Sequence, residues 1–514
     1  MDIKNPELWK EDIKTFRERT AAFYSGEIDK LEYKSISGYY GSYAQRGGAK
    51  NMLRLRMPAG QVTKETLLFL AGIIEKYRIE RLHFTTCQTI QLHDLDGQTA
   101  ADIMEEALEH GIVTMGGGGD YPRNVMCSPL SGVEPGEYFD VQPWAKAAGE
   151  YMMQFLKAEK LPRKLKIGFS NSPENLTHAT YRDLGFAARP DGTFDVYSAG
   201  GLGGMPKFGI RTAEGVKPEH VLYYVHAMWE LFHAYGNYEN RAKARTRFLP
   251  EALGGPDAYR KVFEAELSKV FSLGGELAVS LVPPVIAKVG AGDPPPGPRI
   301  LPQKQAGLYT AVWHPIGGMP DREIFCRLCR AVQDMEAVEM RLSPDQTAYL
   351  INLTGAEAET VLSITTDSAE SIFEMSVSCI GGSTCQTGPR DSQALLLSCM
   401  KAVREAGLSY DALPKIHISG CPSSCGTHQT GVMGFRGARK LADGKPQPAF
   451  TLYLGGNERQ GFETMGKEIG TILQSEISAF LVELGKMAEE SGLGFDAWRK
   501  ENPGAIEALA EKYI

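Results

Sequence analysis

Two regions of the chain carry the same succession of apolar and polar positions. In each region a stretch of helical character precedes a segment in which apolar and polar residues alternate, and a second helical stretch follows. The predicted pairs are helices at 64–77 and 322–335, alternating segments at 83–95 and 341–353, and second helices at 97–110 and 355–365. The pattern therefore predicts the same small unit twice.

The two units also match residue by residue. HFTTCQTIQLHDL at 83–95 aligns without a gap with RLSPDQTAYLINL at 341–353, at an offset of 258 positions. A further pair of segments, 166–186 and 415–435, repeats at an offset of 249. Self-similarity of this length indicates an internal duplication. Duplicated halves usually face each other across a pseudo-two-fold axis, which allows them to share one cofactor.

A stretch rich in proline and glycine, GAGDPPPGP at 290–298, interrupts the pattern between the copies. We infer a mixed α/β (α+β) fold in two halves, each with a small repeat and a larger domain. The predicted divisions are an N-terminal arm at 1–45, a first repeat at 46–112, a first large domain at 113–289, a linker at 290–300, a second repeat at 301–368 and a second large domain at 369–514.

Composition narrows the classes of protein that fit. The 514 residues are 43% hydrophobic and 23% charged, with a net charge of −8, so the chain is globular and lacks the positive charge typical of nucleic-acid binders. The N-terminus shows no secretion signal, and no apolar run reaches the roughly 18 residues of a membrane span. Nine cysteines are an odd number for a disulfide framework. These features predict a cytoplasmic protein with thiols that serve as ligands or core residues.

Four of the cysteines form a pattern typical of a metal centre. Cys379 and Cys385 are spaced C-x5-C, and Cys421 and Cys425 are spaced C-x3-C. Four thiolates suit a cubane iron–sulfur cluster, and a structural zinc ion or ordinary buried thiols are the alternatives. The other cysteines discussed, Cys127, Cys326, Cys329 and Cys399, are interpreted as core residues.

The segment HISGCPSSCGTHQTGVMGFRG at 417–437, preceded by the C-x5-C pair, resembles the signature of sirohaem-dependent sulfite and nitrite reductases. The resemblance extends over roughly residues 40–460. It includes Arg123-Asn124-Val125 after a glycine-rich segment at 116–119, LPRKLK at 161–166, the glycines at 200–204 and LPQKQAGLY at 301–309. It implies two ferredoxin-like repeats and two sulfite/nitrite-reductase domains around one sirohaem and one [4Fe–4S] cluster.

The resemblance also implies roles for individual residues. The four motif cysteines would hold the cluster, and Cys425 would bridge a cluster iron and the sirohaem iron. Sirohaem carries eight carboxylates, so its pocket needs cations and N–H donors. The candidate cofactor-binding residues are Arg46, Gln88, Arg123, Asn124, Arg163, Lys164, Arg436 and Cys425.

The open face of the sirohaem would bind the substrate anion. Arg123, Lys164 and Lys166 match residues that bind the oxyanion in the family, and the spacing of two places both lysines on one face of an extended strand. The family usually reads T-T-R-Q where this chain reads Thr85-Thr86-Cys87-Gln88. Cys87 cannot supply the permanent positive charge of an arginine. We therefore expect Cys87 at the substrate site, where it weakens anion binding.

The retained Lys166 favours sulfite as the substrate, because sulfite is a dianion and nitrite a monoanion. The predicted reaction is the six-electron reduction of sulfite to sulfide. The alternatives are the ammonia-forming reduction of nitrite and a related anion reduction whose specificity is altered by Cys87. A precorrin-modifying oxygenase and a non-enzymatic redox protein are further alternatives. Because the chain has no convincing flavin or nicotinamide fingerprint, the electrons must come from a ferredoxin or from a flavoprotein or iron–sulfur partner.

Overall fold

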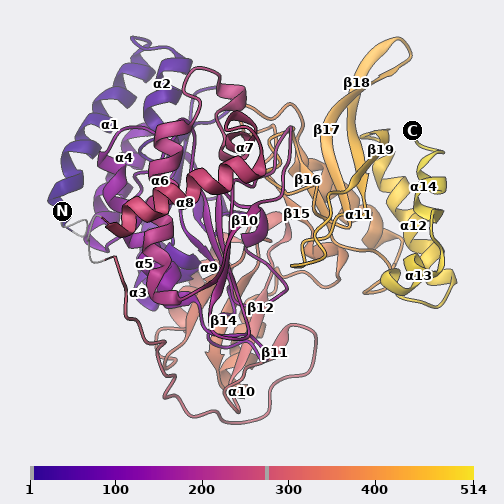
Figure 1. Ribbon diagram of the computed structural model, residues 1–514. Helices are drawn as coiled ribbons and strands as arrows, with labels where there is room; N and C mark the ends of the chain where they lie inside the picture. The colour runs from indigo at the N-terminus through magenta and orange to yellow at the C-terminus, as the bar shows by residue number, and fades with distance from the viewer. Residues whose placement is uncertain (1–4, 273–276) are drawn as a thin grey trace.

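The duplication organises the whole molecule. The computed structural model describes residues 5–272 and 277–514, so residues 1–4 of the predicted arm and 273–276 of the predicted first large domain lie outside the described residues. Within these residues the strands form four sheets, one small and one large in each half. Figure 1 shows the first half, indigo to magenta, beside the second, orange to yellow.

The two small sheets have the same element order. In the first repeat the elements are β1 (Ser42–Ala44), β2 (Asn51–Leu55), α3 (Lys64–Lys76), β4 (Leu82–Phe84), β5 (Ile90–Leu95) and α4 (Gly97–Glu109). In the second they are β11 (Ile300–Pro302), β12 (Tyr309–Trp313), α9 (Arg322–Ala331), β13 (Glu339–Leu342), β14 (Ala348–Leu353) and α10 (Gly355–Ile364). The strand orders are β1-β2-β5-β4 and β11-β12-β14-β13, and the second sheet is extended beyond β13 by a short strand of the first half, β3 (Gln61–Val62). The predicted duplication and the α/β fold class are confirmed.

Equivalent capping residues begin equivalent helices. The side chains of Thr63 and Asp96 accept backbone hydrogen bonds at the starts of α3 and α4. Asp321 and Thr354, each 258 positions further on, do the same for α9 and α10. Such caps satisfy N–H groups that a helix leaves free in its first turn. The shared boundaries of the two repeats therefore follow from residues at matched positions.

The two repeats share one hydrophobic core. Helix α3 packs against α9, and the short strand β3 (Gln61–Val62) of the first half pairs with β13 of the second. Fully buried side chains from both repeats, such as Leu53, Phe84 and Trp313, belong to one continuous apolar cluster. The halves are therefore joined through their interior, which fixes the position of any site between them.

The two large sheets are related in the same way. Their strands are β6 (Met126–Cys127), β7 (Ile167–Ser170), β8 (Leu184–Ala188), β9 (Phe194–Ser198) and β10 (Ile210–Val216), and β15 (Val377–Ser378), β16 (Ile416–Ser419), β17 (Met433–Ala442), β18 (Lys445–Leu454) and β19 (Lys467–Leu473). The helices that cover them include α5 (Gln142–Met153), α6 (Val221–Tyr235) and α8 (Pro256–Ser272), and α11 (Ser392–Glu405) and α12 (Ile477–Glu490). Strands β6, β7 and β8 run parallel, as do β15, β16 and β17. Residues that follow β7 and β16 therefore emerge at equivalent sheet edges.

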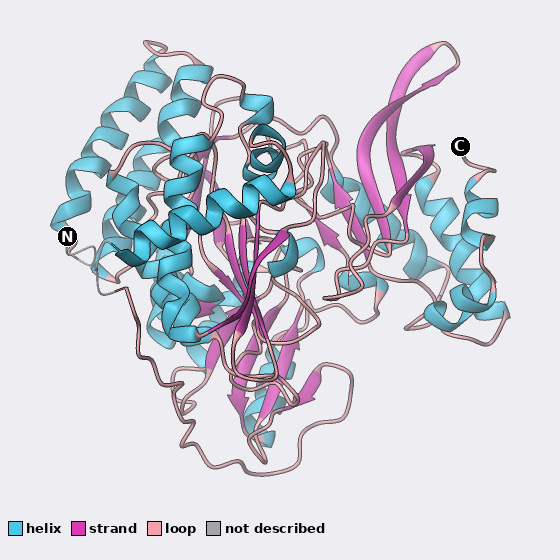
Figure 2. Ribbon diagram, in the orientation of Figure 1, coloured by secondary structure: helices cyan, strands magenta, loops and turns pink. Residues whose placement is uncertain are grey.

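The remaining elements lie outside this duplicated frame. Helices α1 (Glu7–Ser25) and α2 (Lys30–Ser37) occupy most of the predicted arm, α7 (Leu249–Ala252) precedes α8, and α13 (Phe495–Glu501) and α14 (Ala505–Ala510) end the chain. Residues 277–299 contain no helix or strand, so the irregular connection is longer than the predicted linker. Figure 2 shows helices on the outer sides of the molecule and most strands between them. No helix in the described part of the chain has both the length and the apolar character needed to cross a bilayer.

Two glutamines at matched positions tie the halves together. Gln88 and Gln346 both have left-handed backbone conformations, with φ of 52° and 70°. Gln88 Nε2 donates to Cys127 O and to Leu342 O of the other half, and its Oε1 accepts from Cys127 N. Gln346 makes the same exchange with Ser378 and also donates to Phe84 O across the halves. Each amide therefore satisfies backbone groups from two domains at once.

We expect Gln346→Ala to destabilise the protein, because Ser378 N–H loses its buried acceptor. An unsatisfied buried group costs about 1–3 kcal/mol, and about 2–4 °C per kcal/mol gives a fall in apparent Tm of about 2–12 °C. The exposed Gln98, which donates only to Asp102, provides the matched control Gln98→Ala. Equal Tm values for both variants, measured by differential scanning calorimetry, would show that the hydrogen bonds of Gln346 do not stabilise the protein.

Candidate active site

Basic side chains converge beside the segment at residues 85–88. The set consists of Arg54, Arg123, Lys164, Lys166, Arg182 and Arg245. They come from β2, from the glycine-rich segment, from the residues before β7, and from the turns that follow β7 and α6. Burial, followed by the positive charge of neighbouring members, lowers the pKa of Arg123, Lys164 and Lys166, so the side chains lie close enough to interact. We name this set the cation cluster.

The glycine-rich segment positions Arg123. Arg123 Nη1 donates to Gly117 O and Nη2 to Gly119 O, both at 2.8 Å. A side chain at Gly118 would place its Cβ 2.4 Å from Gly38 O, so only glycine allows this approach to the end of α2. The guanidinium therefore sits in a rigid cradle of carbonyl groups.

The two lysines of the K-x-K pair have the most perturbed environment in the cluster. Burial, followed by the positive charges of Lys166, Arg245 and Arg123, holds the pKa of Lys164 well below its usual range. Burial also lowers the pKa of Lys166, although Cys87 opposes this shift. Lys166 Nζ donates to Cys87 Sγ at 3.2 Å. The structure therefore places Lys166 in contact with Cys87 and Lys164 close to Lys166, while their role toward a substrate stays a prediction.

The cations around Cys87 favour the thiolate form of its side chain at neutral pH. Burial alone would raise its pKa, but Lys166, Arg182 and Arg54 together lower it to about 6. The side chain thus supplies a negative charge directly opposite Lys166. The position at which the family usually has an arginine is occupied here by the opposite charge.

Few protein carboxylates neutralise the cation cluster. Asp183 is fully buried and pairs with Arg245 at 3.0 Å, and one of its oxygens accepts Lys166 N. The Nε–H groups of Arg54, Arg123 and Arg245 are buried and have no hydrogen-bond partner within the described residues. Buried cations with free donors require an anionic partner. The site therefore fits a cofactor that carries many carboxylates.

The two cysteine loops lie at the ends of strands of the second large sheet. Cys379 follows β15, and Cys421 and Cys425 follow β16. Gly420 N donates to Cys379 Sγ at 3.3 Å, and Thr387 N donates to Cys385 Sγ at 3.4 Å. Backbone N–H···S bonds of this kind stabilise the thiolate ligands of iron–sulfur clusters.

The spacing of the possible ligands also bears on whether the four motif cysteines hold a zinc ion or an iron–sulfur cluster. Among residues 5–272 and 277–514, no three His, Cys, Asp or Glu side chains are close enough to hold a single metal ion. A structural zinc ion needs four such ligands on one atom. A cubane cluster spreads its four thiolates over four iron atoms, so the two loops suit the cluster better.

Cys425 lies where the two halves meet. Thr86 Oγ1, next to Cys87, donates to Cys425 O at 2.8 Å. Cys425 is exposed to the space between the halves, and Lys164 and Lys166 lie close enough to its thiol to interact with it electrostatically. The cysteine loops and the cation cluster therefore border the same space.

The other predicted cofactor-binding residues are distributed around this space. Asn124 Nδ2 donates to the carbonyls of Cys87 and Gln88, and so fixes the segment that carries the thiolate. Arg46 donates to Cys385 O and Gly388 O, and thereby holds the first cysteine loop. Arg163 pairs with Asp120 at 3.0 Å. These contacts position neighbouring groups, and direct contact of these residues with the cofactor stays a prediction.

Arg436 and Gln88 are predicted to bind the cofactor, but the contacts that they make in the structure are with protein groups. Arg436 lies over the ring of Tyr453 and within 3.5 Å of Glu468, so it is not part of the cation cluster. Gln88 is fully buried, and its amide is occupied by backbone groups of both halves. For both residues the role toward a cofactor remains a prediction from the resemblance.

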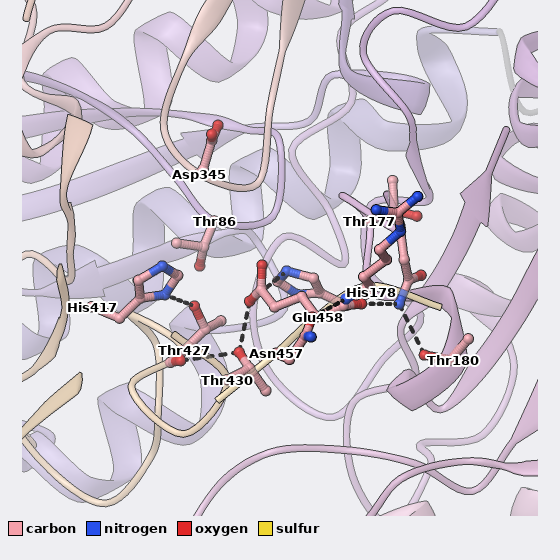
Figure 3. Close-up of polar contacts among 12 residues, drawn as sticks. Thr86, Thr177, His178, Thr180, Asp345, His417, Thr427, Thr430, Asn457 and Glu458 are labelled. Atoms are coloured by element: carbon pink, nitrogen blue, oxygen red, sulfur yellow. Dashed lines mark hydrogen bonds and ion pairs between the residues drawn. The ribbon is translucent and has the colours of Figure 1, made fainter. Parts of the chain in front are cut away.

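An altered copy of the site lies at the related position of the duplicated frame, between residues of both halves. At the repeat offsets, Lys415 stands for Lys166, Asp345 for Cys87 and Leu176 for Cys425, and Lys415 lies 3.8 Å from Asp345. The hollow between them measures only about 10 Å³. Figure 3 shows its surroundings, where Glu458 bonds His178 and Thr430, and His417 bonds Thr427. Leucine in place of the predicted bridging cysteine and the lack of space leave one working site.

Sequence reasoning missed part of the cation cluster. Arg54, Arg182 and Arg245 were not singled out, although a basic run, RAKARTR at 241–247, was visible in the sequence. Arg247 of the same run donates to Leu202 O in the segment at 200–204, and burial lowers its pKa to about 10. The basic run at 241–247, whose Arg247 contacts the glycine-rich segment at 200–204, was the signal that could have identified Arg245.

Comparison with known proteins agrees with this architecture. A model of the nitrite/sulfite reductase ferredoxin-like half domain matches residues 43–110, and a model of the nitrite and sulphite reductase 4Fe-4S domain matches residues 118–271. Both matches fall in the first half, whereas the four motif cysteines lie in the second. The NirA protein of Mycobacterium tuberculosis has the same fold, with a TM-score of 0.77 and 21% identity over 97% of each chain.

Relatives cover most of the chain. A ferredoxin–nitrite reductase of Synechococcus elongatus is 28% identical over 425 residues, which are 79% of this chain and 80% of the relative. An assimilatory ferredoxin-dependent nitrite reductase of Haloferax mediterranei is 23% identical over 98% of this chain and 93% of its own length. The chain belongs to the sirohaem-dependent sulfite and nitrite reductase family, and its cofactors are sirohaem and a [4Fe–4S] cluster.

We expect Cys425→Ser to lose the cluster, because a hydroxyl is a poor substitute for a shared thiolate ligand. Iron and acid-labile sulfide in the purified variant should fall below half of the wild-type content. Cys326→Ala, which alters a buried core thiol of α9, should retain both in full. Wild-type contents in the Cys425→Ser variant would exclude Cys425 as a ligand.

Lys164→Met should have opposite effects on the empty and the loaded protein. In the pH range between the lowered pKa of folded Lys164 and its ordinary value, the unfolded chain binds more protons, so stability of sirohaem-free protein rises with pH there. Removing the charge at pH 7 should raise the apparent Tm of that protein by about 2–4 °C, or about 1 kcal/mol. The same variant should retain less sirohaem during gel filtration.

The exposed Lys217 supplies the control Lys217→Met, which should change neither quantity. Loss of thermal stability in the sirohaem-free Lys164→Met protein would contradict the account of repulsion within the cation cluster.

Proposed function

We propose that this protein is a ferredoxin-dependent nitrite reductase that forms ammonia. The relatives named above are ferredoxin-dependent nitrite reductases, which supports the nitrite alternative over sulfite. The observation that carries the proposal is the contact between Lys166 Nζ and Cys87 Sγ at 3.2 Å. Lys166 favours sulfite only if its positive charge has no partner in the protein, and Cys87 is such a partner.

The pair changes the charge that a substrate meets. A thiolate at position 87 compensates the charge of Lys166, and an arginine there would have added a second positive charge. The pocket thus presents two units of positive charge less than the usual family pattern. A dianion gains more than a monoanion from each positive charge, so it loses more from this change. The electrostatics of the site therefore favour nitrite over sulfite.

The remaining cations, Arg123 and Lys164, bind the substrate and deliver a proton to it. Each Nη atom of Arg123 carries a second N–H besides the one that binds Gly117 O or Gly119 O, and these remaining N–H groups can bind nitrite oxygens. Lys164, whose pKa is depressed, gives up a proton more easily than an ordinary lysine and can deliver it as an oxygen leaves as water. When bound, the sirohaem and the cluster would supply the electrons for the reduction.

The donor side of the proposal follows the same relatives. Their names specify ferredoxin, so we propose ferredoxin as the source of the six electrons. The cytoplasmic location remains a prediction from the sequence. Retention of Arg123, Lys164 and Lys166 supports an anion reductase over a precorrin-modifying oxygenase or a redox protein without a substrate.

A graded series at position 87 tests the proposal. Cys87→Ser removes the negative charge, and Cys87→Arg replaces it with a positive one. We expect the ratio of kcat/KM for sulfite to that for nitrite to rise about tenfold at each step, which corresponds to about 1.4 kcal/mol per step. Kinetics are compared at equal sirohaem content with a chemical reductant, so that ferredoxin binding does not enter.

Wild-type protein should prefer nitrite. A wild-type preference for sulfite would refute the proposed substrate, and an unchanged ratio across the series would show that residue 87 has no part in selectivity.

A further inference from the structure

A second cavity lies in the second half, where residues of the small repeat meet the segment that precedes the first cysteine loop. It measures about 230 Å³. The lining residues are Pro298, Arg299, Leu301, Val312, His314, Tyr349, Ser368, Ala369, Ser371, Met375 and Tyr410. One of them is a cation, none is acidic, and about half are apolar. The composition is that of a site for an anion with an apolar body.

The charge of Arg299 has no direct counter-ion. Its guanidinium donates to two neutral acceptors, Val312 O and Thr365 Oγ1, and it forms no ion pair within the described residues. Burial lowers its pKa, while Asp367 and Glu370 act from a distance in the opposite direction. Asp367 is occupied by Trp313 Nε1 at 2.7 Å and Asp321 N at 2.9 Å. One end of the guanidinium, Nη1, is left free to bind an anion.

Tyr349 adds a second donor. Its side chain is 8% exposed, and its hydroxyl makes no hydrogen bond within residues 5–272 and 277–514. The hydroxyl is not among the completely enclosed polar atoms, so it reaches the cavity that the residue lines. A buried phenol that is unpartnered and open to a cavity is poised to donate to a ligand.

The duplication explains why there is space here. At the offset of 258, Val312 and His314 occupy the positions of Arg54 and Arg56. Arg56 fills its place in the first half with bonds to Met115 O and Pro122 O. The smaller residues of the second half leave the hollow. Burial lowers the pKa of His314 to about 4, so this wall is neutral and Arg299 is the charged group of the lining.

We propose that this cavity binds a small monocarboxylate with an apolar body about the size of one aromatic ring. Arg299 and the Tyr349 hydroxyl would hold the carboxylate, and Leu301, Val312 and Met375 would contact the body. A cavity of about 150 Å³ accommodates benzene, so this volume suffices for a ring with one polar substituent. The site is separate from the nitrite site and does not depend on the proposed reaction.

Isothermal titration of the holoenzyme with sodium benzoate tests the proposal, with benzyl alcohol as the neutral isostere. We expect saturable one-to-one binding of benzoate, at least tenfold tighter than that of the alcohol. Tyr349→Phe, which removes only the hydroxyl, should weaken benzoate about tenfold, and Arg299→Gln should weaken it further. The exposed Arg260 provides the control Arg260→Gln, which should bind as wild type.

A filling variant covers the case in which Arg299→Gln does not fold. Val312→Phe should abolish binding, whereas Val312→Ile should retain it. Benzoate should leave the sirohaem absorption spectrum unchanged, and saturating nitrite should not displace it. Equal affinity for the two probes, unaltered binding in Val312→Phe, or displacement by nitrite would each overturn the assignment.

Discussion

Positive charge that the protein does not neutralise is the feature on which the rest of this structure depends. Arg123, Lys164 and Lys166 are brought together from separate segments, although burial and mutual repulsion lower their pKa values. Asp183 offsets only part of this charge. Such an arrangement is unfavourable in an empty protein and favourable around a cofactor with many carboxylates. The fold holds the cation cluster together through the contacts that fix its side chains.

The duplicated frame supplies those supports. A common core joins the two repeats, and Gln88 and Gln346 bond backbone groups across the halves. Because Thr86 holds the loop of Cys425, the cysteines of one half lie against the cations of the other. The copy of this arrangement on the other side has Leu176 and Asp345 at the decisive positions. The duplication thus produced two equivalent arrangements, and the predicted site residues are present in one of them.

Much of this could be predicted from the sequence because it depends on local pattern. The repeats, their helices and the four cysteines follow from periodicity and spacing, and the offsets of 258 and 249 hold in the strands of the structure. Contacts between distant segments could not be predicted in this way. Cys87 and Lys166 are 79 positions apart, and their contact reverses what Lys166 alone implied about sulfite. The free hydroxyl of Tyr349 likewise depends on packing that no local pattern encodes.

The most direct test of the account is an optical titration of the oxidised holoenzyme with nitrite. Because we propose that Arg123 and Lys164 bind the substrate, nitrite should shift the sirohaem absorption band saturably in the wild-type protein. In the double variant Arg123→Met/Lys164→Met, at equal sirohaem content, the half-saturating concentration should rise by about a hundredfold, since two charge-assisted contacts at about 1.5 kcal/mol each are lost. The same half-saturating concentration in both proteins would contradict the central claim.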